Sequence, residues 1–445
     1  MSNALNAGVH GMSLQTKFRA LSRLGHAFTV PDRSVARPEG DVVLYSCHDV
    51  DRSMVEDGKR FSPLLEGIRR TVSELGYKAV NLTHPLALFP GSTIKGGSMT
   101  MNYRALALRG RAVAARSLGL GGSTARLDLE MAFYGRLLDR IKPRMLISIQ
   151  PPAALCRAAR QRGILVAEAL HGSNYSLNNT IMTAYMAVPD DHLPNVLISF
   201  DDVSQATMAT MCAGRDITAL QTNHPWLHSL RKARGAHSGH TQAQGGRKKV
   251  LVTLQWGYDG ERDYLSNIIP NGILHPVLGE VFAKGADAYD FLIRMHPIQM
   301  NQNGYRHHRA YIEALPSRFP NVEWREASTR PLPLLLDEAV GHITMSSSSV
   351  GEAAATQVPS LMICPTLQPG GALHGFFREL EAEGLVTFGT LDAGAILEWI
   401  GARAASDKVR APYDIESRHA EELAFYHALL ARGTTASPPH ARTSS

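Results

Sequence analysis

The residue types best suited to phosphate chemistry gather in the second half of the chain, first in the stretch "YDFLIRMHP". It is an apolar run that ends in Arg294, His296 and Pro297, with the arginine and the histidine two positions apart. Residues two apart in an extended strand project to the same side. A guanidinium binds phosphate oxygens with paired N–H donors, and an imidazole adds a hydrogen bond or a positive charge. The pair predicts an anion-binding site at the end of a buried strand.

A second stretch, "GHITMSSSSVGEAAATQ", places four serines between an apolar run and a helical pattern. The serines are Ser346, Ser347, Ser348 and Ser349. Serine hydroxyls cap helices, and the free N–H groups at a helix start bind anions. Glu352, about one turn further on, can accept from a ribose diol or complete an ordinary capping box. By itself the stretch fits a plain helix cap equally well. With Arg294 and His296 upstream, it predicts one half of a nucleotide phosphate clamp.

Strands and helices in alternation are needed to position these residues. From Val42 onward, short apolar runs alternate with helical patterns, which is typical of parallel sheets with helices on both faces. A polar segment rich in Gly and Gln interrupts the alternation and predicts a domain boundary. Ligands bind beyond the carboxyl ends of such strands, so we expect the site in a cleft between two domains. The predicted segments are an N-terminal arm (1–40), a first α/β domain (41–230), a linker (231–248), a second α/β domain (249–411), a helix (412–432) and a disordered tail (433–445).

The composition narrows the class of protein. A formal charge of +6 and a pI near 9.1 suit an anionic partner, but the charge is spread along the chain and forms no nucleic-acid-binding arm. The four cysteines include no CxxC pair, which indicates a reducing compartment and neither a disulfide framework nor a zinc ribbon. The carboxylates of "PDDH" and "FDD" match no DxD arrangement, so no metal site is predicted.

"RMHP" together with "PLPLLLDEAVGHITMSSSSVGEAAATQVPSLMICP" resembles the donor-binding domain of GT-B glycosyltransferases. The stretch is most similar to the bacterial capsule and surface-polysaccharide group of sialyltransferases, Kdo transferases and CDP-glycerol glycerophosphotransferases. UDP-GlcNAc 2-epimerases share the pattern of a strand, a serine turn and "EA". The specific match covers roughly a fifth of the chain, and the two-layer organisation extends the likeness to nearly all of it. The resemblance implies an α/β fold of two Rossmann-like domains that face a cleft, with a C-terminal helix that crosses back to the first domain.

The resemblance also implies an activity. A sugar would move, without a metal ion, from a CMP-, UDP- or CDP-linked donor to a hydroxyl of a bacterial surface glycan or glycolipid. Single displacement would invert the anomeric carbon, and retention stays open as the alternative. The donor would bind the second domain, its phosphate held by Arg294, His296 and the four serines, and its ribose by Glu352. This nucleotide-sugar is a substrate, and no cofactor is expected.

The same resemblance bears on partners and place of action. The partners would be the nucleotide-sugar donor and a glycan or lipid-linked acceptor, with no nucleic acid. The enzyme would act in the bacterial cytoplasm, and the basic charge is compatible with peripheral association at the inner face of the membrane.

The first domain of such enzymes supplies the general base, and His171 in "ILVAEALHGSN" is the predicted one. Gly172 permits a tight turn after the strand, and the dipeptide resembles the His-Gly motif of the glycerophosphotransferases. An imidazole with a pKa of roughly 6.5 can take a proton from an acceptor hydroxyl at neutral pH. The alternative is a histidine hydrogen-bonded into the turn. Glu168 is interpreted as a strand residue or a supporting one.

Other strand ends offer further candidates. Asp202 in "SFDDVS" is a rival base, although we favour a role as the N-cap of the following helix. His48 and Asp49 in "SCHD" are similarly ambiguous. Gly257 in "LQWGYDGERD" would let the backbone approach the donor, and Asp259 would face the cleft. The second His-Pro pair, in "TNHPW", is interpreted as a structural turn at the hinge.

Three other functions stay open at this point. Transfer of a polyol phosphate, such as glycerol phosphate from CDP-glycerol, uses the same motifs and is supported by the His-Gly element. A non-catalytic nucleotide-binding protein would keep the fold without turnover. A 2-epimerase fits the fold but needs several acidic residues around the sugar, which the sequence does not place.

Overall fold

A computed structural model describes most of the chain. The described residues are 25, 27–33, 40–47, 54–117, 125–172, 176–177, 180–234, 246–258, 265, 267–301, 303–405 and 415–435. Several predictions fall outside them: most of the N-terminal arm, linker residues 235–245, tail residues 436–445, and the candidates His48, Asp49 and Asp259.

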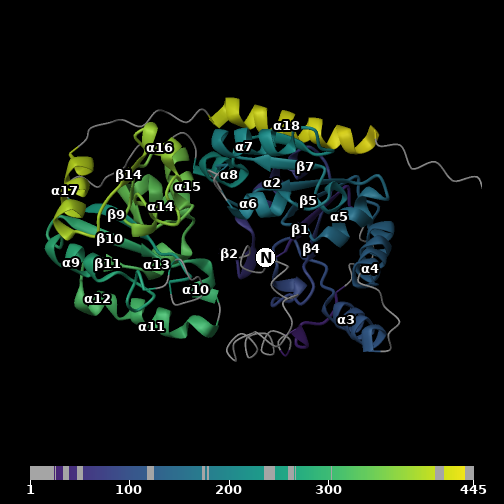
Figure 1. The fold of residues 1–445 in the computed structure, drawn as a ribbon, viewed down its shortest axis with the longest axis horizontal. Helices are drawn as coiled ribbons and strands as arrows, with labels where there is room; N and C mark the ends of the chain where they lie inside the picture. Colours follow the sequence, from purple (N-terminus) through teal and green to yellow (C-terminus); the bar gives the residue numbers. More distant parts are fainter. Residues whose placement is uncertain are drawn as a thin grey trace, which may run out of the picture.

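The first sheet has six parallel strands in the order β4-β1-β5-β6-β7-β8 (Figure 1). The strands are β1 (Val42–Ser46), β4 (Ala79–Thr83), β5 (Met145–Ile149), β6 (Leu165–Ala169), β7 (Val196–Ser199) and β8 (Thr218–Gln221). β1 and β5 are buried along their whole length, because helices cover both faces of the sheet. The chain adds β4 on one side of β1 and then returns to add β5 on the other, which makes a switch point between β1 and β5.

The second sheet repeats this plan in the order β11-β10-β9-β12-β13-β14. The strands are β9 (Lys248–Thr253), β10 (Tyr289–Arg294), β11 (Val322–Glu323), β12 (Ala339–Thr344), β13 (Ser360–Met362) and β14 (Val386–Phe388). A short antiparallel hairpin of β2 (Met54–Glu56) and β3 (Lys59–Phe61) stands apart from both sheets. In Figure 1 the two sheets form two lobes, with β2 at the place where the lobes adjoin.

Helices connect the strands of each sheet. Those of the first lobe are α2 (Pro63–Glu74), α3 (Asn102–Ser117), α4 (Ala125–Ile141), α5 (Ala153–Arg160), α6 (Thr180–Met186), α7 (Asp202–Cys212) and α8 (Pro225–Arg234). Those of the second are α9 (Pro276–Lys284), α10 (Pro297–Asn301), α11 (Arg306–Glu313), α12 (Leu315–Arg318), α13 (Arg325–Thr329), α14 (Leu332–Glu338), α15 (Ser349–Ala355), α16 (Arg378–Ala382) and α17 (Ala393–Ala404).

The last helix, α18 (Ile415–Thr435), follows the second sheet in the chain but packs on the first lobe (Figure 1). Tyr426, Leu429 and Leu430 of α18 are buried in the same apolar cluster as Leu44 of β1 and Ile147 of β5. The predicted α/β class, with two Rossmann-like domains and a C-terminal helix that crosses back to the first, is therefore confirmed. Within the residues that the structure describes, no helix is both long enough and apolar enough to cross a bilayer.

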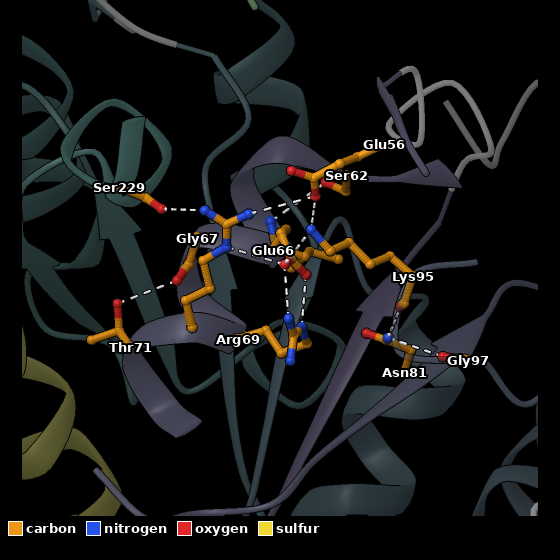
Figure 2. A network of polar contacts seen from close by, with 12 residues as sticks. Glu56, Ser62, Glu66, Gly67, Arg69, Thr71, Asn81, Lys95, Gly97 and Ser229 are labelled. Atoms are coloured by element: carbon orange, nitrogen blue, oxygen red, sulfur yellow. Dashed lines mark hydrogen bonds and ion pairs between the residues drawn. The ribbon is translucent and has the colours of Figure 1, made fainter. Parts of the chain in front are cut away.

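A polar network fixes α2 to α8 and to the segment that follows β4 (Figure 2). At its centre is Glu66, whose side chain is nearly buried and lies 2.7 Å from Arg69, 3.2 Å from Arg70 and 3.5 Å from Lys95. Arg70 also donates to Oγ of Ser229 in α8, at 2.9 Å. A buried carboxylate is costly to desolvate, and the ion pairs with these cations offset that cost.

Gly67 lets α2 approach α8 closely. A Cβ atom at this position would lie 2.7 Å from the carbonyl carbon of Pro225 and 2.8 Å from the backbone nitrogen of Trp226. Both neighbours are backbone atoms, which cannot move aside without shifting α8. The contact matters for the whole molecule, because α8 is the last described helix before the chain leaves for the second sheet.

Gly67→Ala should lower the stability of the protein, although alanine favours helices over glycine by roughly 1 kcal/mol. The matched change Gly110→Ala, in α3, meets nothing within 4 Å of its Cβ and should stabilise by about 0.5–1 kcal/mol. Urea unfolding followed by circular dichroism measures both midpoints. Equal shifts in the same direction for the two variants would show that the α2–α8 contact is not tight.

Candidate functional site

The carboxyl ends of three adjacent strands define the candidate site of the second domain. The chain places β10 and β11 on one side of β9 before it returns to place β12 on the other, so β9 and β12 flank the switch point. Ligands of open parallel sheets bind at such points. Arg294 of β10 and Thr344 of β12 are both in register with Thr253 of β9. The residues that follow these strands therefore lie together at one edge of the sheet.

Ser346 begins the turn after β12 and is engaged within the fold. Its backbone N–H and its hydroxyl both donate to Oε1 of Gln255, at 3.1 and 2.9 Å. The hydroxyl of Tyr258 lies 3.2 Å from Oγ of Ser346. Ser346 thereby holds the loop after β9 against the serine turn.

Ser349 is also buried, in a polar network around His342. Its Oγ lies 2.9 Å from Oγ1 of Thr253 and 3.4 Å from Nε2 of His342. The ring of His342 contacts Thr253 through Nε2, at 2.8 Å, and Ser360 through Nδ1, at 2.9 Å. Complete burial lowers the pKa of His342 to about 3, so the ring is neutral, with one nitrogen donating and the other accepting. The network joins β9, β12 and β13 at the base of the serine turn.

The two middle serines lie nearer the surface. Ser347 is half-buried, and its Oγ accepts the backbone N–H of Ser349 at 3.2 Å, which satisfies one free donor at the start of α15. Ser348 is exposed. The N-cap residue of α15 is Ser348, whose side chain makes no cap hydrogen bond, so the predicted role of a serine at the helix start is taken by Ser347, one residue earlier. Of the four serines, two have hydroxyls committed to the interior, and the other two are the ones that a ligand can reach most directly.

Arg294, at the end of β10, supports the fold with one nitrogen and couples to Glu352 in α15. Its Nη1 donates to the carbonyl oxygens of Ala327 and Arg330, at 2.7 and 2.5 Å, and so stabilises the end of α13. Burial lowers the pKa of Arg294 to about 10, and the charge of Glu352 opposes this change. Burial raises the pKa of Glu352 to about 7, and the charge of Arg294 opposes that one. Arg294 and Glu352 therefore interact through their charges near the switch point.

His296 is held in a defined orientation at the start of α10. The ring atom Nδ1 of His296 accepts the backbone N–H of Ile298 at 3.2 Å, and the backbone N–H of His296 donates to Oε1 of Gln299 at 3.0 Å. In the neutral ring the proton is therefore on Nε2, which makes Nε2 the donor toward a ligand. The imidazole is half-buried, and its centroid lies 6.2 Å from that of Trp256.

The His-Pro dipeptide proves to be a recurrent helix start in this chain. Nδ1 of His275 accepts from the backbone of Val277 at 3.2 Å, and Nδ1 of His224 accepts from Leu227 at 3.4 Å. Pro276 and Pro225 then begin α9 and α8. The predicted structural turn at "TNHPW" is confirmed. The dipeptide alone is not a ligand signature, and His296 is distinguished from the other two by its place at the switch point.

The loop after β9 supplies residues that the sequence analysis did not single out. Gln255 bridges to the serine turn, and Trp256 lies next to His296. Their signal was present in "LVTLQWG", because polar and aromatic residues directly after a buried strand stand at the ligand edge of the sheet. Gly257 has a φ of 101°, in the left-handed region, which explains the glycine there. Asp259, two residues on, lies outside the described residues.

Glu168 is a buried acid at the carboxyl edge of the first sheet. It lies at the end of β6, accepts a hydrogen bond from the hydroxyl of Tyr185 and another from the backbone of Gln150. Burial raises the pKa of Glu168 to about 7, although both hydrogen bonds act to lower it. Gln150 adjoins the switch point after β5, has a φ of 48° and accepts from Sγ of Cys47 at 3.4 Å. A left-handed φ is uncommon outside glycine and is found at strained functional positions.

The predicted base, His171, is exposed just beyond the end of β6, and Gly172 beside it is half-buried. His171 therefore stands at the carboxyl edge of the first sheet, as the sequence predicted for its position. Glu168 precedes it on the same strand. The interpretation of Glu168 as a strand residue is confirmed, but its burial and raised pKa were not expected.

The N-cap of α7 is Asp201, and the prediction of Asp202 for this role is wrong by one residue. Oδ1 of Asp201 accepts the backbone N–H of Ser204 at 2.8 Å, because Asp201 has an extended backbone that lets its carboxylate reach back to the helix start. Asp202 is already in the first turn, is exposed and accepts from Gln221 at 2.6 Å.

Comparisons with known proteins locate the chain by fold. No family model matches the sequence, and no curated protein matches it either. Among solved structures, the UDP-GlcNAc 2-epimerase from Methanocaldococcus jannaschii is similar, with a TM-score of 0.52 and 11% identity over 88% of this chain and 99% of that one. The UDP-N-acetylglucosamine 2-epimerase from Rickettsia bellii gives a TM-score of 0.51 and 10% identity over 88% of this chain and 96% of that one.

The wall teichoic acid polymerase TagF is also among the similar structures, with a TM-score of 0.49 and 12% identity over 93% of each chain. At these identities the likeness concerns the fold. Because it spans both sheets and nearly the full length of the epimerases, the chain has the GT-B fold.

The pKa of about 7 for Glu168 predicts a dependence of stability on pH. Since this folded-state pKa exceeds the ordinary value of 4.5, the folded protein holds the proton more tightly than the unfolded chain. The contribution of protonated Glu168 to the free energy of unfolding is therefore complete below about pH 4.5 and is lost as the pH rises through about 7. Glu168→Gln should therefore remove this loss and be more stable than the wild type at pH 8, by up to about 3 kcal/mol. The measurement is the unfolding midpoint of the variant minus that of the wild type, taken once at pH 5 and once at pH 8. The same difference at both pH values would contradict the assignment.

Proposed function

We propose that the protein is a glycosyltransferase that moves a sugar from a nucleotide-sugar donor to an acceptor hydroxyl, with the donor at the switch point of the second sheet. One observation carries the proposal. His296, Trp256 and the outer serines Ser347 and Ser348 follow three adjacent parallel strands, so an imidazole, an indole ring and two hydroxyls lie at one sheet edge. The imidazole and the hydroxyls suit the oxygens of a phosphate, and the indole suits the base or sugar ring of a nucleotide-sugar.

The charge that develops on the leaving phosphate needs positive groups and N–H donors. Nε2–H of His296 and the hydroxyls of Ser347 and Ser348 are the proposed donors in contact with the phosphate oxygens. Arg294 has its Nη1 committed to the end of α13, so its proposed role is to supply positive charge close to the phosphate. Glu352, coupled to Arg294, is the proposed acceptor for the ribose diol. Ser346 and Ser349 support this arrangement from within the fold.

The acceptor is proposed to bind at the carboxyl edge of the first sheet, with His171 as general base. The imidazole would take the proton of the acceptor hydroxyl as the oxygen attacks the anomeric carbon. The bond between that carbon and the phosphate oxygen breaks, the nucleotide leaves with the electron pair, and the anomeric centre inverts. A bacterial surface glycan or glycolipid is the proposed acceptor, following the resemblance of the serine and His-Pro motifs.

A second candidate is the epimerisation of a nucleotide-sugar. The buried acid Glu168 favours it, because a carboxyl with a pKa near 7 can exchange a proton with a sugar carbon or hydroxyl. The epimerase from M. jannaschii, which shares the fold, has been solved in complex with UDP-GlcNAc and UDP. The two candidates differ in whether free nucleotide is formed. A transferase releases the nucleotide only when an acceptor is present, whereas an epimerase leaves the nucleotide attached to the sugar. A panel of CMP-, UDP- and CDP-linked donors, followed by chromatography of nucleotide and sugar, separates them. The panel also reveals transfer of a polyol phosphate from CDP-glycerol.

His296→Asn should lower kcat/KM by about 10²–10³-fold, because it removes Nε2–H while the asparagine side chain still caps α10. The matched control is His427→Asn, which changes an exposed histidine of α18 and should leave the rate unchanged. Nucleotide release from the donor is the measured quantity. If His296→Asn keeps wild-type turnover, the phosphate does not bind at this strand end.

A further inference from the structure

Three side chains with metal-binding groups meet where α8 and α18 pack on α2. His228 comes from α8, whereas His419 and Glu422 are one turn apart on α18 and so project from the same face. One ligand atom from each of the three lies within 4.8 Å of the others. No metal site was predicted from the sequence, because the acidic stretches "PDDH" and "FDD" match no DxD arrangement. His228 is distant in the chain from His419 and Glu422, and the packing of α18 on the first lobe brings them together.

The three groups are shielded from water. The exposed fractions of His228 and Glu422 are 2% and 0%, and His419 is partly covered. The rings of His228 and His419 are stacked, with centroids 5.0 Å apart and planes 7° from parallel. Two imidazoles and a carboxylate in so dry a place are costly to bury without a compensating charge. A divalent cation supplies that charge.

A second layer of side chains orients the potential ligands. Nε2 of His419 lies 2.7 Å from Oε1 of Glu74, so a proton on Nε2 leaves the lone pair on Nδ1, which is buried. Oε1 of Glu422 lies 2.5 Å from the hydroxyl of Thr71, which leaves Oε2 as the second carboxylate oxygen. Both supporting residues belong to α2 (Thr71 is labelled in Figure 2). A carboxylate on the outer nitrogen of a histidine is the usual support of a zinc-bound imidazole.

We infer that His228, His419 and Glu422 bind one divalent transition-metal ion, with Zn²⁺ as the preferred occupant. Two imidazole nitrogens and a carboxylate oxygen are a ligand set that zinc accepts at about 2.0–2.2 Å, with water in the fourth position. Small rotations of the three side chains bring the ligand atoms from their present spacing to that distance. The ion joins α8 to α18 across α2.

The position of the site gives the ion a structural role. α8 is the last described helix before the chain passes from the first sheet to the second, and α18 is the first after it returns. A metal ion between them ties together the two chain segments that connect the domains. Its effect is on the stability of the first lobe and of the crossing helix, and it is independent of the proposed transferase site.

The test uses the full-length protein, stripped of metal with a chelator and then titrated with Zn²⁺ alone. The expected result is one zinc ion per chain by calorimetry and by elemental analysis after gel filtration, together with a rise in the melting temperature. Co²⁺ in place of Zn²⁺ should give the visible d–d absorption of a four-coordinate site. No zinc retained on gel filtration and no change in melting temperature would overturn the inference.

Variants assign the ion to these residues. Glu422→Gln and His419→Gln should each weaken zinc binding by at least about 100-fold, and Glu74→Gln by about 10–100-fold through the lost support of His419. Glu422→Gln removes a buried charge at nearly constant volume, so it should fold, and circular dichroism confirms that it does. The matched control is His427→Gln, an exposed histidine of the same helix, which should bind zinc as the wild type does. Equal zinc affinity in the double variant His419→Gln/Glu422→Gln and the wild type would place the ion elsewhere among the chain's 19 histidines and overturn the inference.

Discussion

The return path of the chain between parallel strands is the constraint on which the rest of this structure depends. A parallel strand can be followed by another only after a crossover, usually a helix, so every loop that leaves a strand end lies at the same edge of the sheet. In the second sheet this brings His296 after β10, Trp256 after β9 and the serines after β12 to one edge, although they are distant in sequence. In the first sheet the same rule places Cys47, Gln150 and His171 along one edge.

Buried hydrogen bonding shapes the donor side of the candidate site. A strand end inside a protein leaves polar groups that must find partners, and here side chains of the loops supply them. His342 stays neutral and connects Thr253 with Ser360, while Gln255 accepts twice from Ser346. These bonds leave Ser347 and Ser348 nearest the surface. The inner half of the serine turn thus builds a rigid support for the outer half, which is the arrangement that a preorganised phosphate site requires.

The connections between the lobes have their own packing. α8 lies against α2 through the contact at Gly67, and α18 covers both helices while Tyr426 and Leu429 enter the core of the first sheet. Burying the polar cluster of His228, His419 and Glu422 at this junction costs free energy that apolar packing would not. The inferred cation would offset that cost. It would also hold together α8 and α18, the helices next to the two chain segments that connect the domains.

The sequence by itself determined the α/β class, the two-layer plan and the strand ends at which Arg294, His296 and the serines stand. Those features follow from local patterns, namely apolar runs, helical periodicity and residues that break them. Tertiary structure alone decided which serines point inward, because their partners Thr253 and Gln255 come from the neighbouring strand β9 and from the loop after it. It also decided the raised pKa of Glu168, which depends on burial, and the meeting of His228 with α18. The choice of Asp201 over Asp202 as N-cap turned on a backbone angle. Each of these outcomes depends on neighbours or angles that a linear pattern does not contain.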